Sequence, residues 1–360
     1  IPLKPTMRLL FEISHLRNAS PATVSRAGVL FLNETDVGWS PYQQSWLENF
    51  AHVHAAHIDQ KATAVLEALF VQYVGAAIEM IRKSKWQTIT PVQDISMVMC
   101  LCALLGTLLT PTNCPKGSDR EVYEAYFQYA AMWAFGGPLG ADKTCDYRKL
   151  FSEWWRGEWS RSSYKIPDEG LVFDYYVDAE TKKPTHWREV VPRYVAPVLG
   201  ETFAFASIVV PTVHSTRLNR LVGTLAAHRH PVMLVGGAGS AKTTICNEHL
   251  AELPDEAMSF AFSFSAYTDA SALQAILEQP LEKKAGTLYA PPGTKWLTYF
   301  VDDLNMPQPD KYGTQSAIEL LRQQVDYGGF YDLKKLTLKQ IKNVQYIGAM
   351  NPTAGSFAII

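Results

Sequence analysis

The sequence contains little cysteine and almost no excess charge, and each shortage excludes a class of protein. Its 360 residues include five cysteines at irregular spacing, none of them in a Cys-x-x-Cys pair. A disulfide framework and a structural zinc site are therefore not expected, and free thiols fit a reducing compartment. The formal net charge is only −2, with lysine and arginine scattered along the chain. Because nucleic-acid binding normally needs a basic patch, it is not predicted either.

Neither a signal peptide nor a membrane-spanning run is expected. The first residues, Ile-Pro-Leu-Lys, lack the apolar core of a signal peptide. The membrane-like run at residues 95–109 is shorter than the roughly 20 residues that a bilayer requires, and we expect a buried core helix there. No membrane partner is therefore predicted. A hydrophobic share of 47% still provides for large cores, in two or three domains.

The strongest motif lies at residues 231–250, where an apolar run leads into a glycine-rich turn and then a helical pattern. This order is typical of the phosphate-binding P-loop, G-x-x-x-x-G-K-[ST]. Lys242 would reach the β- and γ-phosphates, and the Thr243 hydroxyl would ligate Mg²⁺. Ala241 stands where the motif has its second glycine. The residues predicted to surround the phosphates are Gly236, Gly237, Ala238, Gly239, Ser240, Ala241, Lys242, Thr243 and Thr244.

Two further motifs follow in the order expected of an ATPase. Residues 297–303 read as a Walker B strand, whose last apolar residue is followed by Asp302, a predicted Mg²⁺ ligand. Asp303 stands where such ATPases usually carry a glutamate to orient the attacking water, and its side chain is shorter by about 1.5 Å. Residues 344–351 form another strand that ends in Asn351, an amide for the γ-phosphate and the water. Together the motifs predict a site for ATP or ADP with Mg²⁺.

The patterns along the chain predict an α/β fold that is interrupted by a long helical stretch. Short strands are expected at 7–13 and 28–32 with a helical turn at 21–26, and a second α/β unit opens with a strand at 205–211 and a helix at 215–228. A β-hairpin is expected between them, with arms at 170–178 and 185–191. Both ends look cut, so we expect a part of a larger polypeptide. The helices expected between Trp39 and Trp159 are 41–57, 60–83, 92–109, 118–136 and 143–157.

Several of these strings resemble axonemal dynein heavy chains, and outer-arm chains of the β type in particular. The strings at 300–307 (Phe-Val-Asp-Asp-Leu-Asn-Met-Pro), 312–315, 318–323 and 350–357 are similar to the third AAA+ module of that family. Those at 6–13 and 20–28 are similar to the end of the second module's large subdomain. The resemblance covers nearly the whole chain.

The resemblance implies an architecture of four parts. A P-loop AAA+ large subdomain, a parallel sheet with flanking helices, would be preceded by the α-helical lid of the previous module. The implied parts are 1–38 as the end of the second module's large subdomain, 39–160 as its helical lid, 161–200 as a β-hairpin connector, and 201–360 as the truncated large subdomain of the third module.

The resemblance also implies a function and partners. Dyneins couple ATP hydrolysis in a six-module ring to stepping on microtubules, in the axoneme of cilia and flagella after assembly in the cytoplasm. The main hydrolytic site and the microtubule-binding stalk would lie outside this chain, and the third-module site would be regulatory. Implied partners are the other AAA+ modules and the linker of the same heavy chain, other axonemal dynein subunits, and the microtubule through parts absent here.

Two further sets of residues are assigned by resemblance. Arg26 lies in a turn between expected strands, where AAA+ proteins carry an arginine finger that reaches a neighbour's nucleotide, here the first module's ATP. The alternative is a surface arginine that pairs with a nearby acid. Val210, Pro211 and Thr212 are similar to the segment that lines the adenine pocket.

Two functions of different classes remain open. In the first, Lys242, Thr243, Asp302, Asp303 and Asn351 are the working parts of an ATPase module. In the second, the module binds nucleotide for stability without hydrolysing it. Ala241 brings a Cβ close to the phosphates and Asp303 is short, so binding with slow or absent turnover is favoured. A stand-alone P-loop enzyme is a third, weaker reading.

Overall fold

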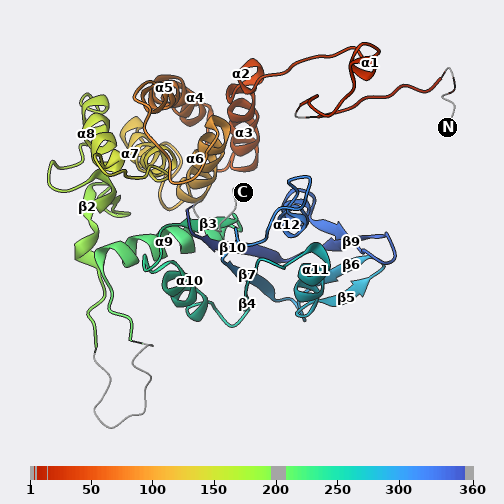
Figure 1. Cartoon of the computed structure of the whole chain (residues 1–360). Helices are drawn as coiled ribbons and strands as arrows, with labels where there is room; N and C mark the ends of the chain where they lie inside the picture. Colours follow the sequence, from red (N-terminus) through yellow and green to blue (C-terminus); the bar gives the residue numbers. More distant parts are fainter. Residues whose placement is uncertain (1–3, 5, 14, 196–207, 353–360) are drawn as a thin grey trace, which may run out of the picture.

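The computed structural model of the chain describes residues 4, 6–13, 15–195 and 208–352, and it contains a helical body beside an α/β body (Figure 1). All five predicted helices between Trp39 and Trp159 are present. The second is continuous from Gln60 to Lys83 through a π-helical turn, and another π-helical turn extends the fourth. The elements are α3 Ser40–Val53, α4 Gln60–Leu69, η1 Phe70–Val74, α5 Gly75–Lys83, α6 Asp94–Leu108, α7 Arg120–Ala131, η2 Met132–Gly136 and α8 Tyr147–Glu158.

Aromatic side chains fill the core of the helical body. Trp155 and Phe127 are fully buried, and Trp159 stacks on Tyr73 with ring centroids 3.6 Å apart. Each buried ring removes a large apolar area from water, so these rings contribute strongly to the stability of this body. The aromatic side chains of α7 are therefore core packing.

The apolar helix α6 is buried on one side only. Leu101 and Leu105 are fully buried between α3, α7 and η2, whereas Met99 is 46% exposed. The prediction of a core helix is confirmed, although one side of the helix is exposed. In the described part of the chain, the helix Gln60–Lys83 is the one long and apolar enough to cross a membrane. Its apolar residues Leu66 and Phe70 are instead packed inside the helical core.

The predicted strands at 7–13 and 28–32 are wrong. The described residues there form no strand, and large apolar side chains are exposed, with Leu10 at 98% and Leu30 at 89%. An isolated strand leaves its backbone N–H and C=O groups unpaired, and no described strand lies alongside to pair with them. The predicted helical turn is present as α1 Pro21–Val24, which Ser20 caps, and a second short helix, α2 Glu34–Val37, follows.

The predicted hairpin is present with shorter arms than expected. Strand β1 Tyr175–Val177 pairs antiparallel with β2 Pro184–His186, and the 3₁₀ turns η3 Val172–Asp174 and η4 Trp187–Val190 flank them. The Asp178 carboxylate closes the turn by accepting hydrogen bonds from the Thr181 N–H and hydroxyl, both 2.8 Å long.

Helix α9 Val213–Ala227 joins the two bodies and confirms the predicted helix at 215–228. Leu218 and Leu221 pack against the helical core, while Val222 and Ala226 belong to a core of the α/β body. The guanidinium of Arg217 donates to the Asp174 carboxylate at 2.6 Å, a largely buried ion pair that ties α9 to the hairpin. Because either charge alone would be poorly solvated, separating the pair costs free energy. We therefore infer that the pair fixes the orientation of α9 relative to the hairpin.

The α/β body is built on a parallel four-stranded sheet in the order β3-β10-β7-β4, which confirms the predicted fold class. Its outer helices include α10 Lys242–Ala251, and the predicted strands at 297–303 and 344–351 are both present. The strand predicted at 205–211 falls partly outside the described residues, and 208–211 form no strand. The remaining elements are β3 Val232–Val235, β4 Ala257–Ser263, α11 Ala270–Glu278, β7 Trp296–Asp302, α12 Ser316–Tyr327 and β10 Val344–Met350.

A second sheet beyond α11 and α12 was not predicted. Its strands follow the order β5-β6-β9-β8, with one parallel and two antiparallel pairings. The Lys339 ammonium lies 2.7 Å from both the Glu278 and the Asp332 carboxylates and fixes this sheet to α11. The strands are β5 Glu282–Ala285, β6 Leu288–Ala290, β8 Gly329–Tyr331 and β9 Leu338–Ile341.

Candidate nucleotide-binding site

The sheet order brings the three predicted motifs to one edge. Strand β10 lies between β3, which leads into the P-loop, and β7, which ends in Asp302. All three strands are parallel, so their carboxyl ends meet, and Asn351 follows β10 directly between the other two motifs. The Gly236 N–H donates to the Met350 carbonyl at 3.2 Å, which fixes the start of the loop against β10.

The P-loop forms the predicted turn between a strand and a helix, and the residue just before the helix is left-handed. Gly239 has φ of +77°, and Ala241 has φ of +63° and ψ of +20° at the N-cap of α10. The helix N-terminus thus points its free N–H groups into the loop, an arrangement that attracts anions. Alanine in this conformation carries about 1 kcal/mol of strain that glycine would avoid.

Lys242 and Thr243 each contact a residue of another predicted motif. The Lys242 ammonium donates to the Gly236 carbonyl at 2.7 Å and to the Gly237 carbonyl at 2.9 Å, so it lies across the loop. It is also 3.3 Å from the Asn351 side-chain oxygen. The Thr243 hydroxyl donates to the Asp302 carboxylate at 2.7 Å. Residues that are far apart in the sequence therefore converge on one small region.

Asp303 combines an unusual backbone with a perturbed carboxyl group. Its φ is +52°, and its N–H donates to the Asp302 carboxylate at 3.0 Å. Burial raises the pKa of the Asp303 carboxyl, the neighbouring Asp302 raises it further, and Lys242 opposes the shift. A carboxylate with a raised pKa is a better proton acceptor, which suits a group that orients and activates water.

The oxygen atoms at this edge fit Mg²⁺ held together with a nucleotide. The donors are the Thr243 hydroxyl and the Asp302 carboxylate, both hard oxygen ligands. Within the described residues, no group of three or more His, Cys, Asp or Glu side chains forms a metal site by itself. Mg²⁺ commonly binds through one or two carboxylates plus phosphate oxygens and water, so this sparse set fits it.

Two family models cover most of the chain. The model described as "P-loop containing dynein motor region" matches residues 198–360, and the "Dynein heavy chain AAA lid domain" matches residues 66–189. The chain belongs to the dynein heavy-chain family. The recognition made from the sequence is thereby confirmed, and so is the order of a lid domain before a P-loop domain.

Its curated relatives are axonemal dyneins. The chain is 46% identical over 360 residues to dynein axonemal heavy chain 9 of Homo sapiens, and 45% identical over 359 residues to the ciliary dynein beta chain of Heliocidaris crassispina. It is 44% identical over 363 residues to the beta chain of the flagellar outer arm of Chlamydomonas reinhardtii. Each match covers 100% of this chain but only 8% of the relative. The family places this dynein chain in the axoneme of a cilium or flagellum.

Arg26 lies away from the other site residues of this dynein chain. It is exposed, and its guanidinium donates to the Ala22 carbonyl at 2.6 Å. The segment around α1 lies apart from the α/β body (Figure 1). The structure therefore does not bring Arg26 to the P-loop, and its predicted target is a nucleotide of another module.

The segment predicted to line the adenine pocket leads directly into α9. Val210 is 54% exposed, and the Thr212 hydroxyl accepts a hydrogen bond from the Ser215 N–H at 3.1 Å as the cap of α9.

Cys246, in the helix after the P-loop, is fully buried, and burial raises its pKa to about 12. Cys246 therefore belongs to the core of the α/β body.

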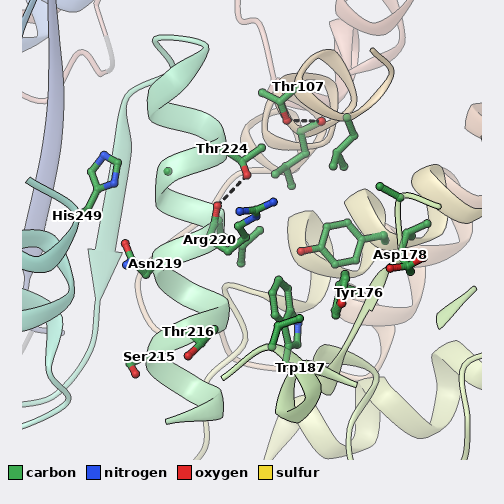
Figure 2. Close-up of a pocket in the computed structure, with 18 of the residues that line it drawn as sticks. Thr107, Tyr176, Asp178, Trp187, Ser215, Thr216, Asn219, Arg220, Thr224 and His249 are labelled. Atoms are coloured by element: carbon green, nitrogen blue, oxygen red, sulfur yellow. Dashed lines mark hydrogen bonds between the residues drawn. The ribbon is translucent and has the colours of Figure 1, made fainter. Parts of the chain in front are cut away.

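A cavity of about 860 Å³ lies beside α9 and is distinct from this cluster (Figure 2). Tyr176 and Trp187 of the hairpin line one side, and Asn219 and His249 lie toward α10. Among the described residues, neither the P-loop nor the acidic pair after β7 contributes to its lining. The nucleotide assignment therefore rests on the convergence of side chains at the sheet edge.

Sequence reasoning missed Asn305. It lies in the turn after β7, is fully buried, and donates from its side-chain amide to the Asn351 carbonyl at 2.8 Å. The only signal was its place in the string that follows the acidic pair.

Ala241→Gly is expected to stabilise the chain by about 0.5–1 kcal/mol, because glycine adopts positive φ without a Cβ clash. Urea denaturation would measure the gain as a higher midpoint with an unchanged slope. Gly239→Ala is the matched control, since its φ is also positive and an added Cβ there meets nothing within 4 Å. It should lose a similar amount of stability. A loss of stability in Ala241→Gly would contradict the assignment of strain to Ala241.

Proposed function

We propose that this chain contributes a nucleotide site, for ATP or ADP with Mg²⁺, to the ATP-driven ring of a dynein that moves along microtubules. The observation that carries the proposal is the contact set around Lys242. Its ammonium reaches the loop carbonyls and Asn351, while the adjacent Thr243 hydroxyl reaches Asp302. The family membership supports the same conclusion.

Each residue of the cluster has a role that follows from its chemistry. Lys242 would exchange its carbonyl contacts for the β- and γ-phosphate oxygens, to which an ammonium binds more strongly than to neutral acceptors. Thr243 and Asp302 would hold Mg²⁺, which neutralises phosphate charge when bound. Asn351 would bind the γ-phosphate, and Asp303 would orient the attacking water. The loop N–H groups from Gly236 to Thr244 would surround the phosphates.

We propose further that this site regulates the ring more than it drives it. Asp303 is one methylene shorter than the usual glutamate, and positioning of water tolerates little error. The alternative is a structural module that binds nucleotide without hydrolysing it. Asp303 still places a carboxylate beside Asp302, which favours residual turnover over none.

The remaining assignments stay proposals of the same kind. Residues 1–38 would complete the large subdomain of a second module, 39–160 its lid, 161–200 the connector, and 201–360 part of a third module. Arg26 would act on the nucleotide of another module, and Val210, Pro211 and Thr212 would contact adenine. The proposed partners are the other modules and linker of the heavy chain, further axonemal subunits, and the microtubule through other parts.

The proposal predicts binding that depends on magnesium. Titration calorimetry of the purified 360-residue chain should show one site for Mg-ADP and for Mg-ATP. Chelation of Mg²⁺ with EDTA should weaken ATP binding at least tenfold, about 1.4 kcal/mol. Thr243→Val, which removes the hydroxyl but keeps the size, should weaken it similarly and abolish the effect of EDTA. Binding that is indifferent to both changes would refute the assignment of Thr243 and Asp302.

A further inference from the structure

The side chain of Asn305 forms a link between two motifs of the nucleotide site. Asn305 is 0% exposed, and its amide nitrogen donates to the backbone carbonyl of Asn351 at 2.8 Å. Burying an amide costs free energy unless its polar atoms are paired, and a leucine would fill a comparable volume without that requirement. An amide at this position therefore makes a directional hydrogen bond that an apolar side chain cannot make.

The turn that carries Asn305 is docked on the end of β10 at several points. The Leu304 N–H donates to the Ala349 carbonyl at 3.0 Å, and the Met306 N–H closes the turn on the Asp303 carbonyl at 2.9 Å. The Leu304 side chain packs close to Gly348, where an added Cβ would lie 3.3 Å away. The turn and the strand end therefore form one packed unit, and a shift of either would be transmitted to the other.

With the Asn305 contact, hydrogen bonds and short stretches of backbone together connect the site residues in a ring. Lys242 contacts the Asn351 side chain at 3.3 Å, and its neighbour Thr243 contacts Asp302 at 2.7 Å. Asp302 accepts from the Asp303 N–H at 3.0 Å, and the turn from Asp303 leads to Asn305, which returns to Asn351. The Asn305 bond is the part of this ring that fixes the backbone of Asn351 itself.

We infer that Asn305 is a positioning residue. It holds Asn351 and Asp303 in fixed positions relative to each other, so that the site binds a nucleoside triphosphate differently from a diphosphate. The inference rests on the proposed function of the site. The Asn305 amide contacts the backbone carbonyl of Asn351, so it acts on this residue through the direction of its backbone. Because Asn351 is expected to meet the γ-phosphate, a loosened Asn351 affects the triphosphate and spares the diphosphate.

The variant Asn305→Asp tests this inference, because it keeps the shape but replaces the amide donor with an acceptor that faces a carbonyl oxygen. Calorimetry with AMP-PNP, a non-hydrolysed ATP analogue, should show an affinity about tenfold lower, with the affinity for Mg-ADP changed less than twofold. The matched control is Gln345→Glu, a buried amide in β10 that donates to the Thr298 hydroxyl at 2.8 Å, away from the P-loop. The control should alter stability without changing the ratio of the two affinities.

A second pair of variants separates positioning from a general loss of folding. Asn351→Ala keeps the carbonyl that Asn305 contacts but removes the side chain expected to meet the γ-phosphate. It should lower AMP-PNP affinity about tenfold, and adding Asn305→Ser, which shortens the donor, should lower it no further. Equal loss for both nucleotides in Asn305→Asp, or additive losses in the double variant, would overturn the inference. If the unmodified chain binds neither nucleotide, the proposed function itself fails, and this inference fails with it.

Discussion

Replacing Lys242 by alanine should lower the affinity of the chain for Mg-ADP by at least about 100-fold, equivalent to about 2.7 kcal/mol. A phosphate-bound ammonium makes charge-assisted hydrogen bonds in a partly desolvated loop, and alanine offers neither charge nor donor. The contacts of the ammonium with the Gly236 and Gly237 carbonyls, at 2.7 and 2.9 Å, are given up on binding, so the expected loss of affinity comes from the phosphate contacts.

Titration calorimetry of the chain with Mg-ADP measures this loss directly. Lys334→Ala is a suitable control, because Lys334 is exposed in the turn between β8 and β9 of the second sheet. Its removal changes the net charge of the chain by the same amount. A thermal melt would show that both variants remain folded. Unchanged affinity in the Lys242 variant would remove the basis for a P-loop at residues 236–244, whatever the family membership.

The site could be predicted from sequence because its parts are local. Lys242 and Thr243 follow a glycine-rich turn, and Asp302 follows an apolar strand, so each motif is visible within about ten residues of chain. What the sequence did not contain is the strand order. The position of β10 between β3 and β7 is what places Asn351 within 3.3 Å of Lys242. Only the assumption of parallel strands, later confirmed, brought the motifs together beforehand.

Each wrong or missing prediction has a specific structural cause. The strands predicted at 7–13 and 28–32 rested on apolar β-forming residues alone, yet a strand needs a partner, and none is present among the described residues. The second sheet was missed because its strands are short and partly charged, as in the Glu-Lys-Lys-Ala of β5. Asn305 was missed because an asparagine in a turn is usually explained by the turn itself. Its burial and its contact with Asn351 depend on chain segments that meet only in the folded protein.

Whether the site hydrolyses ATP depends on Asp303, and two substitutions there should act in opposite directions. Asp303→Asn keeps the size and removes the proton acceptor, so it should lower the turnover of ATP about 100-fold and leave Mg-ADP affinity within about twofold. Asp303→Glu extends the carboxylate by about 1.5 Å and should raise turnover about tenfold, toward that expected of the usual glutamate.

The pH dependence of turnover tests the role of the Asp303 carboxylate more specifically than a change in side-chain length does. Because burial and Asp302 raise the pKa of Asp303, turnover should fall on acidification at a higher pH than the ordinary value of about 3.9 would give. The sign follows from the role, since only the deprotonated carboxylate accepts a proton, and a raised pKa moves its loss toward neutral pH. This acid limb should vanish in Asp303→Asn. Single-turnover assays over a range of pH would measure turnover in the purified chain and in both variants, and titration calorimetry would measure the affinity for Mg-ADP. Turnover that is absent in the unmodified chain and appears only in Asp303→Glu would favour the structural module, whereas turnover indifferent to both substitutions would exclude Asp303 from the chemistry.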